Sequence, residues 1–416
     1  MDKTIYWIWL SLACTPDSAT FPKLISKFDD AEAIYNADDR EIMSCIGARA
    51  SDRTRLNNKS LSKAEKIFEF CQKYNVGILT YSSENYPNSL RSIKTPPVLL
   101  YYRGNLPDFN RGFFVASVGT RWLSDYGRRW AFRLSYDLAS AGATIVSGMA
   151  IGIDGVSHAA ALSAGKHTVA VIGSGIDVCY PKCHLKLAKE IVKDGCVLTE
   201  FPPKTPPYKR NFPKRNRIIS ALSSATVVIE GKEKSGALIT ARCAMDQGKT
   251  VYALPGNVGN DNSQLTSLLL KNGAKAITVA EDVLKDFSDK YSGIINPFDL
   301  KSKPEVNMME QLSYLGISAN CPSDDIFKPS SKRTQNKTRE ENTAKACVNS
   351  SAKGAIDSFD AASIALYEKI PEEMEVDIES LVCETLNLRE LMRCLLKLEV
   401  AGFVEVLPGE RVRRKS

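Results

Sequence analysis

The chain has 416 residues, of which 44% are hydrophobic and 25% are charged, a composition that excludes collagen-like and wholly disordered proteins. Lysine and arginine outnumber aspartate and glutamate by 55 to 48, and the resulting net charge of +7 permits an anionic partner without requiring one. At roughly 100–200 residues per domain, this length predicts two or three domains.

The N-terminal part, residues 1–105, is predicted to be a small helical domain. Segments 24–28 and 63–74 have the apolar spacing of amphipathic helices, and the apolar segment 6–13 is too short for a secretory signal, so it predicts a core helix. Residues 98–102, VLLYY, predict a short strand.

Residues 106–296 alternate between apolar runs and helical patterns. The runs end in glycine or serine and are continuous, which is typical of strands buried on both faces of a parallel sheet with covering helices. Right-handed crossovers then place the loops after the strands along one edge, where open α/β sheets bind ligands. The predicted strands lie at 113–119, 143–148, 168–175, 225–231 and 250–256.

The rest of the chain changes character twice. Residues 297–357 are polar and predict a flexible linker. In residues 358–416, leucines recur at helical spacing up to Leu398, and the segments VEVL (404–407) and RVR (411–413) then flank a turn at Pro408 and Gly409. Three helices followed by a two-stranded ribbon is the order of a winged-helix domain.

No stretch approaches the ~20 apolar residues that cross a membrane. Eleven cysteines form no paired CxxC sets, which indicates reduced thiols and not a disulfide framework. These features predict a cytoplasmic protein.

The strongest functional signal is the decapeptide YKRNFPKRNR at 208–217. Cations that follow phosphates, beside a ring on which a base stacks, are what single-stranded nucleic acid binding needs. A solvated basic loop ahead of a helix is the alternative, but the decapeptide follows EFPP (200–203) at the expected ligand-binding edge, which favours binding. The cations are Lys209, Arg210, Lys214, Arg215 and Arg217, and the rings are Tyr208 and Phe212.

Two glycine-containing turns indicate anion contacts at the same edge. Glycine lets the backbone approach an anion, the following helix presents unpaired N–H groups, and an arginine in the first turn suits a bidentate phosphate contact. The second turn is either a phosphate cradle of backbone amides or a tight helix start. The residues are Gly119, Thr120 and Arg121 in the first turn and Ser235, Gly236 and Thr240 in the second.

Other chemistries lack their motifs. The glycines at 147–155 are spaced G-x-x-x-G-x-x-G, unlike the dinucleotide fingerprint G-x-G-x-x-G, so NAD binding is not expected. Cys179, Cys183 and His184 lie close together, but no second pair of suitable spacing completes a zinc site. No nucleophile motif or GKS/T loop occurs. We therefore expect no metal, no cofactor and no ATP-driven mechanism.

With these motifs the sequence resembles the DNA-processing protein A (DprA) family of bacteria, also called Smf. The resemblance implies a small N-terminal helical domain of the SAM or HhH type over 1–105, an extended Rossmann-like core over 106–296 and a winged helix over 358–416. The segments that carry it are GTR (119–121), SGMAIGIDGVSHAAAL (147–162), VIGSGIDVCYP (171–181), FPKRNRIISALS (212–223), SGALITA (235–241) and ALPGNV (253–258).

The resemblance also implies a function. Such proteins bind and shield incoming single-stranded DNA and help the RecA recombinase displace single-strand-binding protein, chiefly in natural transformation of competent cells. They tend to form homodimers through the Rossmann-like core, for which the apolar segment 264–270 is a candidate surface. In this sequence the resemblance implies that Arg121 and Lys209 contact phosphates and that Phe212 stacks on a base. It also implies that Arg215, Asn216 and Arg217 line the same pocket.

Two alternatives come from other classes of protein. A nucleotide-binding enzyme is one, because the core distantly resembles phosphoribohydrolases. However, Ala241, Arg242 and Cys243 stand where the catalytic glutamate of those enzymes is expected, so we predict a binding protein and not an enzyme. The other is a winged helix that reads duplex DNA through a row of basic residues at 389, 393 and 397. The same row could instead be a solvated helix face or a contact with another protein.

Overall fold

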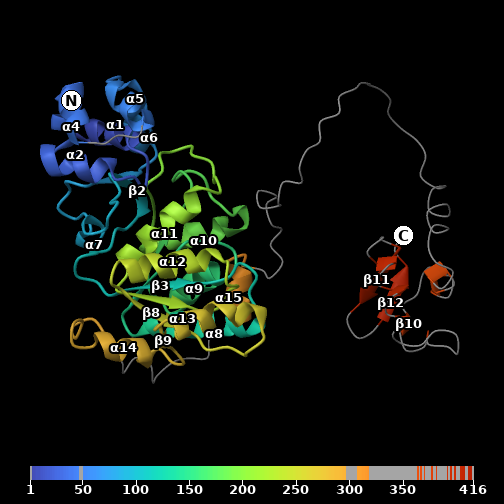
Figure 1. Cartoon of the computed structure of the whole chain (residues 1–416). Coiled ribbons are helices and arrows are strands. Elements are labelled where there is room, and N and C mark those ends of the chain that lie inside the picture. The colour runs from blue at the N-terminus through green and yellow to red at the C-terminus, as the bar shows by residue number, and fades with distance from the viewer. Residues whose placement is uncertain are drawn as a thin grey trace, which may run out of the picture. The chain divides into compact units, whose positions relative to one another are not determined.

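A computed structural model describes residues 2–45, 50–296 and 307–317, together with a minority of the residues between 363 and 414 (Figure 1). The chain divides into two compact units, Met1–Pro329 and Ser330–Ser416. Among the described residues, no helix is both long enough and apolar enough to span a membrane.

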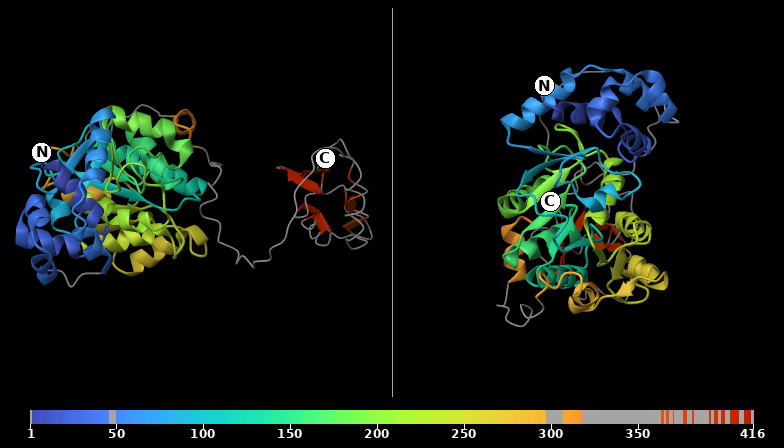
Figure 2. Two further views of the ribbon diagram at one scale, coloured as in Figure 1. Left: turned by 90° about the horizontal axis from the view of Figure 1, so that it is seen from above. Right: turned by 90° about the vertical axis from the view of Figure 1, so that its left-hand side faces the viewer.

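Six short helices form the N-terminal part, and Figures 1 and 2 show them gathered at one end of the first unit. The first is buried on several sides, since Trp7, Ile8, Trp9 and Leu10 are consecutive and all lie in the core. A helix that is apolar all round must be covered by its neighbours, which explains why the others surround it. The helices are α1 (Thr4–Ala13), α2 (Thr20–Phe28), α3 (Ala31–Asn36), α4 (Asp39–Cys45), α5 (Ala50–Asn57) and α6 (Ser62–Lys73).

A nine-stranded sheet follows, in the order β1-β2-β6-β5-β4-β3-β7-β8-β9. β2 pairs antiparallel with both β1 and β6, and every other pairing is parallel. The predicted α/β class with a mostly parallel sheet is therefore confirmed. The strands are β1 (Gly77–Thr80), β2 (Leu99–Gly104), β3 (Phe114–Val118), β4 (Thr144–Ser147), β5 (Thr168–Val171), β6 (Cys196–Thr199), β7 (Ala225–Val228), β8 (Thr250–Ala253) and β9 (Lys275–Ala276).

Helices cover both faces of the sheet because the strand residues that point to either face are apolar. In β3, Val115 joins the core on the side of α8, α9 and α10, whereas Ala116 and Val118 join the core on the side of α11, α12 and α13. These helices are α8 (Asp125–Ser140), α9 (Ile153–Ser163), α10 (Leu185–Asp194), α11 (Asn211–Leu222), α12 (Gly236–Asp246) and α13 (Gln264–Lys271), and the remaining ones in this unit are α7 (Asn88–Arg91), α14 (Glu281–Phe287) and α15 (Met308–Tyr314).

The strand order changes direction at β3. From β3 the chain runs outward through β4, β5 and β6, and it then returns to β7 on the other side of β3 before running outward again through β8 and β9. Such a reversal leaves a crevice beyond the carboxyl ends of the two central strands, which is where open α/β sheets bind ligands.

The structure places two segments differently from the predicted boundaries. β1 and β2 belong to the sheet, so the sheet begins at Gly77 and not after residue 105. α15 lies inside the segment predicted as a linker, and it folds because Leu312 and Leu315 are buried against the core of the first unit. Most of the predicted linker lies outside the described residues.

The second unit is described only in part. β10 (Val376–Asp377), β11 (Val404–Leu407) and β12 (Arg411–Arg414) form an antiparallel sheet in the order β10-β12-β11. β11 and β12 correspond to the two strands of the predicted ribbon. The predicted turn at Pro408 and Gly409 lies outside the described residues. Leucines at helical spacing are buried against the sheet, among them Leu391, Leu395 and Leu398.

His158 makes the stability of the first unit depend on pH. It is buried in α9, its Nδ1 lies 2.8 Å from Thr168 Oγ1, and burial lowers its pKa from 6.5 to about 3. Because the folded pKa lies below the unfolded one, the full stabilisation is present above pH 6.5 and is lost as the pH falls toward 3. We expect the free energy of unfolding to drop by about 1–2 kcal/mol between roughly pH 7.5 and roughly pH 5.5 on account of this residue.

Urea denaturation at the two pH values measures this effect, and His158→Gln should remove it. The variant keeps the smaller contributions of His167 and His184, whose pKa values burial also lowers. An equal pH dependence in the variant and the unmodified protein would contradict the assignment.

Candidate functional site

A cavity of about 520 Å³ lies beyond the carboxyl ends of β3 and β7, at the point where the strand order reverses. We call it the switch-point pocket. Five cations and one carboxylate, Asp154, line it, which makes its charge strongly positive. The cations are Arg121, Lys209, Arg215, Lys232 and Lys234.

The structure brings together nearly all of the residues predicted from the sequence. The first turn, the second turn and the start of α11 come from three different loops and meet at this pocket. The predicted residues that line it are Gly119, Thr120, Arg121, Lys209, Phe212, Arg215, Asn216, Ser235, Gly236 and Thr240, whereas Arg217 does not.

The first turn is fixed by backbone contacts with Glu230 and α9. The N–H of Thr120 donates to the carbonyl oxygen of Glu230 at 2.9 Å, and the N–H of Ile153 donates to the carbonyl of Thr120 at 3.2 Å. A Cβ atom at Gly119 would lie 2.5 Å from Cγ1 of Ile153, so this close approach requires glycine. The side chain of Arg121 is thereby held at the mouth of the pocket.

Phe212 forms an aromatic wall between basic groups. The guanidinium of Arg121 lies 5.5 Å from the centroid of the Phe212 ring, and that of Arg215 lies 5.9 Å from it. The ring of Tyr180 is 5.6 Å away, and a Cβ atom at Gly173 would lie 3.1 Å from Cδ1 of Phe212. These contacts fix the ring, which is half-buried, in one orientation.

Arg215 is buried, and its guanidinium is bonded to the backbone of two strand ends. Its Nη1 donates to the carbonyl of Gly148 at 2.7 Å and also to that of Val171. Burial lowers its pKa to about 10, a shift that the nearby Asp154 opposes. Arg215 therefore adds positive charge to the floor of the pocket while it holds β4 and β5 in register with α11.

Asn216 connects the two helices that border the pocket. Its Nδ2 donates to the carbonyl oxygen of Gly236 at 3.3 Å, at the first residue of α12. A Cβ atom added at Gly236 would have no atom within 4 Å, so the space in front of this helix N-terminus is open. Ser235 Oγ has no hydrogen-bond partner within the described part of the chain. A phosphate placed here would meet backbone N–H groups and the positive end of the helix dipole.

Arg217 points away from the pocket and pairs with Glu200 instead. Its Nη2 donates to Glu200 Oε2, and the two side chains are only 9% and 5% exposed. Burial raises the pKa of Glu200, and Arg217 opposes that rise. This placement gives Arg217 a buried ion pair and no surface in the pocket.

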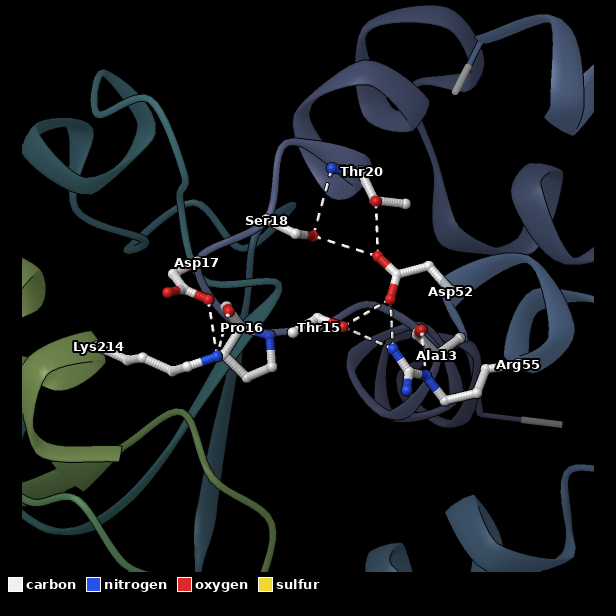
Figure 3. A network of polar contacts seen from close by, with 9 residues as sticks. All are labelled: Ala13, Thr15, Pro16, Asp17, Ser18, Thr20, Asp52, Arg55 and Lys214. Carbon is white, nitrogen blue, oxygen red and sulfur yellow. Dashed lines mark hydrogen bonds and ion pairs between the residues drawn. The ribbon is translucent and has the colours of Figure 1, made fainter. Parts of the chain in front are cut away.

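Lys214 also points away from the pocket, toward the N-terminal helices (Figure 3). Its Nζ donates to the carbonyl of Pro16 at 3.1 Å and lies 2.8 Å from Asp17 Oδ1. The loop that carries Pro16 and Asp17 is held in turn by buried Asp52, whose carboxylate accepts from the hydroxyls of Thr15, Ser18 and Thr20 and from Arg55. Lys214 thus ties α11 to the N-terminal helices.

One aromatic residue and two cations of the lining were not among the predicted site residues. Trp122 follows the first turn and is 70% exposed, so it offers an aromatic ring at the rim of the pocket. Lys232 and Lys234 follow β7 and add two exposed cations. The sequence signals were present, since a tryptophan extends GTR to GTRW and the run KEK directly follows the strand ATVVIEG.

The described cysteines and histidines do not form a metal site. Among the residues that the structure describes, no group of three His, Cys, Asp or Glu side chains is placed to hold a metal ion. Among the cysteines that the structure describes, seven are free thiols and Cys183 is disulfide-bonded, which differs from the expectation of reduced thiols throughout.

Comparisons with known proteins agree with this fold. The family described as DNA recombination-mediator protein A matches residues 77–288. The DNA processing protein DprA of Bacillus subtilis is 39% identical over 236 residues, which cover 57% of this chain and 80% of that protein. Protein Smf of Escherichia coli is 42% identical over 210 residues, which cover 50% of this chain and 56% of that protein.

A solved structure extends the agreement to three dimensions. The X-ray structure of DNA processing protein A from Streptococcus pneumoniae aligns with a TM-score of 0.60 and 33% identity, covering 69% of this chain and 98% of that one. The fold and the pocket define a Rossmann-like protein with a strongly basic cavity at the point where the strand order reverses. The chain belongs to the DNA recombination-mediator protein A (DprA/Smf) family.

Proposed function

We propose that the chain binds single-stranded DNA in the switch-point pocket and acts as a recombination mediator without catalysing a reaction. The observation that carries the proposal is the combination of five cations, one buried carboxylate and two aromatic rings in a single cavity. Positive charge attracts the phosphates of any strand, and aromatic rings stack with any base. Neither kind of contact reads base edges, so affinity should depend little on base sequence.

The described contacts suggest a role for each part of the pocket. Arg121, Lys209, Lys232 and Lys234 line the pocket, and we assign the phosphate contacts to these cations. Phe212 offers a stacking surface, and the amides at Gly236 offer a cradle for one phosphate, with Ser235 and Thr240 beside it. Arg215 and Asn216 hold these groups in place.

Further steps of the proposal rest on membership in the family. We propose that the bound strand is protected and passed to the RecA recombinase in the cytoplasm, with displacement of single-strand-binding protein, as in natural transformation. The C-terminal unit is proposed to be a winged helix, which its described strands and buried leucines support. We also retain a homodimer through the Rossmann-like core as a proposal, although α13 already buries Leu265 and Leu269 within its own chain.

A nucleotide-processing enzyme is less well supported. Asp154 is the one carboxylate among the residues that line the pocket, and its Oδ2 accepts from the N–H groups of Gly148 at 3.2 Å and Ala150 at 3.4 Å. A carboxylate that is buried and held by the backbone in this way serves to position the loop after β4. No observation in the pocket therefore favours glycosidic hydrolysis.

Titration with labelled oligo-dT and with a duplex of equal length, at several salt concentrations, tests the proposal. We expect the single strand to bind more tightly, and the logarithm of its affinity to fall with the logarithm of salt with a slope of about −2 to −3, as about three or four phosphate contacts require. Preference for the duplex would point to the C-terminal unit instead. Absence of binding at low salt would remove the proposal.

A further inference from the structure

A second basic cavity lies beside the switch-point pocket, between α6 and the loop that leads from β6 into α11. It measures about 420 Å³, and we call it the α6 groove. Lys63, Lys66 and Lys204 line it together with the rings of Phe70 and Tyr208, and its lining contains no carboxylate. Three cations with two aromatic rings and no opposing charge are the combination that a nucleic acid strand requires.

The helical wall of the groove is one face of α6. Lys63, Lys66, Ile67 and Phe70 are spaced i, i+3, i+4 and i+7, so they lie above one another along the same side of the helix. The two lysines are exposed, while Ile67 and Phe70 are partly buried against the core. The charged ends are therefore presented to solvent from a helix that is anchored by its apolar residues.

The opposite wall is a loop fixed by hydrogen bonds. Asp177 Oδ1 accepts from the N–H of Lys204 at 2.7 Å, and the N–H of Gly175 donates to the carbonyl of Thr205 at 2.8 Å. A Cβ atom at Gly175 would lie 2.8 Å from the backbone of this loop, which explains that glycine of the VIGSGIDVCYP segment.

Lys204 itself has a φ of +64°, in the left-handed region where glycine or asparagine is easier to accommodate. A lysine at this position keeps a cationic side chain in the groove despite its unfavourable backbone conformation. The ammonium group lies 6.0 Å from the centroid of the Phe70 ring on the opposite wall.

Both walls are held in one arrangement. Figure 3 shows that Lys214 of α11 contacts Pro16 and Asp17 between α1 and α2. α1 packs against α6 in the N-terminal core. The helix that carries two of the lysines is therefore positioned relative to the DNA-binding helix through a polar contact and a packed core.

The groove and the switch-point pocket adjoin at two consecutive residues. Tyr208 lines the groove, and the next residue, Lys209, lines the pocket, so the two cavities are joined by neighbouring residues whose Cα atoms are about 3.8 Å apart. The side chain of Tyr208 is 48% exposed, and the guanidinium of Arg210 lies 5.2 Å from the centroid of its ring. A strand that leaves the pocket over Lys209 meets Tyr208 next.

We propose that the α6 groove is a second binding site for single-stranded DNA, which takes the phosphates of the strand beyond the switch-point pocket. The inference rests on the proposed function, since it extends the path of the same ligand. It assigns the N-terminal helices a direct share in binding the strand.

The test compares oligo-dT of about six and about twenty nucleotides, because a single binding fold covers about 4–16 nucleotides. The variant combines Lys63→Ala, Lys66→Ala and Lys204→Ala in the full chain. The control combines Lys73→Ala, Lys189→Ala and Lys271→Ala, three exposed lysines that line neither cavity and whose loss changes the net charge equally. Affinity is measured over a range of salt concentrations.

We expect the groove variant to bind the long oligonucleotide about tenfold more weakly at low salt and to lower the salt slope by about 2, since about three phosphate contacts are lost. Its affinity for the short oligonucleotide should match that of the control. Equal binding of the long oligonucleotide by the groove variant and the control would overturn the inference. If Phe212→Ala still weakens binding in that case, the proposed function stands. If neither Phe212→Ala nor the groove variant changes binding, both the proposed function and the further inference are wrong.

Discussion

Replacing Phe212 by alanine is expected to weaken the binding of single-stranded DNA by about 1–3 kcal/mol, which is roughly 5- to 150-fold in affinity. The ring lines the switch-point pocket and is held there by Tyr180 and by the guanidinium groups of Arg121 and Arg215. Because the surroundings fix its orientation before DNA arrives, a stacked base gains the full contact without ordering the side chain first. Fluorescence titration with oligo-dT measures the loss.

Two companion variants separate stacking from other causes. Phe212→Leu keeps an apolar side chain of similar size but removes the π face, so it should lose most of the affinity that Phe212→Ala loses. Lys209→Ala should instead lower the salt slope by about 0.7, the value for one phosphate contact on a single strand, whereas neither Phe212 variant should change that slope. Full affinity in Phe212→Leu would show that the ring packs and does not stack.

The sequence was sufficient to predict the central strands and the edge of the sheet at which the loops after them meet. β3, β4, β5, β7 and β8 are apolar on both faces, and such runs occur only where helices cover a sheet on both sides. Parallel strands then bring their following loops together, so GTR and SGALITA meet although they are more than a hundred residues apart.

The edge of the sheet was harder to predict. β1 was not predicted as a strand, and the antiparallel addition of β1 and β2 to the sheet depends on pairing that no local pattern reveals. For this reason the boundary at residue 105 separates strands that belong to one sheet.

The decapeptide shows where prediction of the site fails. Its seven charged and aromatic residues were treated as one basic segment, but α11 begins at Asn211, and each helical residue turns by about 100°. Phe212, Arg215 and Asn216 are spaced i, i+3 and i+4 and therefore share the face toward the pocket. Lys214 and Arg217 fall on other sides of the helix, where they meet Asp17 and Glu200.

Arg217→Ala is expected to lower the free energy of unfolding by about 3–5 kcal/mol, because it leaves the buried carboxylate of Glu200 without its counter-ion. Glu200 Oε1 has no hydrogen-bond partner among the described residues, so nothing nearby replaces the guanidinium that Arg217 places on Oε2. Burial already raises the pKa of Glu200, and removal of Arg217 should raise it further. A folded pKa above the unfolded one favours the folded state at low pH, so the defect should be largest near neutral pH and shrink as the pH falls.

Urea denaturation at roughly pH 7.5 and roughly pH 5 measures both parts of this expectation. Combining Arg217→Met with Glu200→Leu should restore much of the stability, since replacing both members of a buried ion pair by apolar groups is often neutral. Under conditions in which it is folded, Arg217→Ala should bind oligo-dT within about twofold of the unmodified protein, because Arg217 has no surface in the switch-point pocket. Normal stability combined with lost DNA affinity would contradict this assignment and would place Arg217 in the binding site. A residue that contacts phosphate contributes to the affinity and to the salt slope without being needed for the fold.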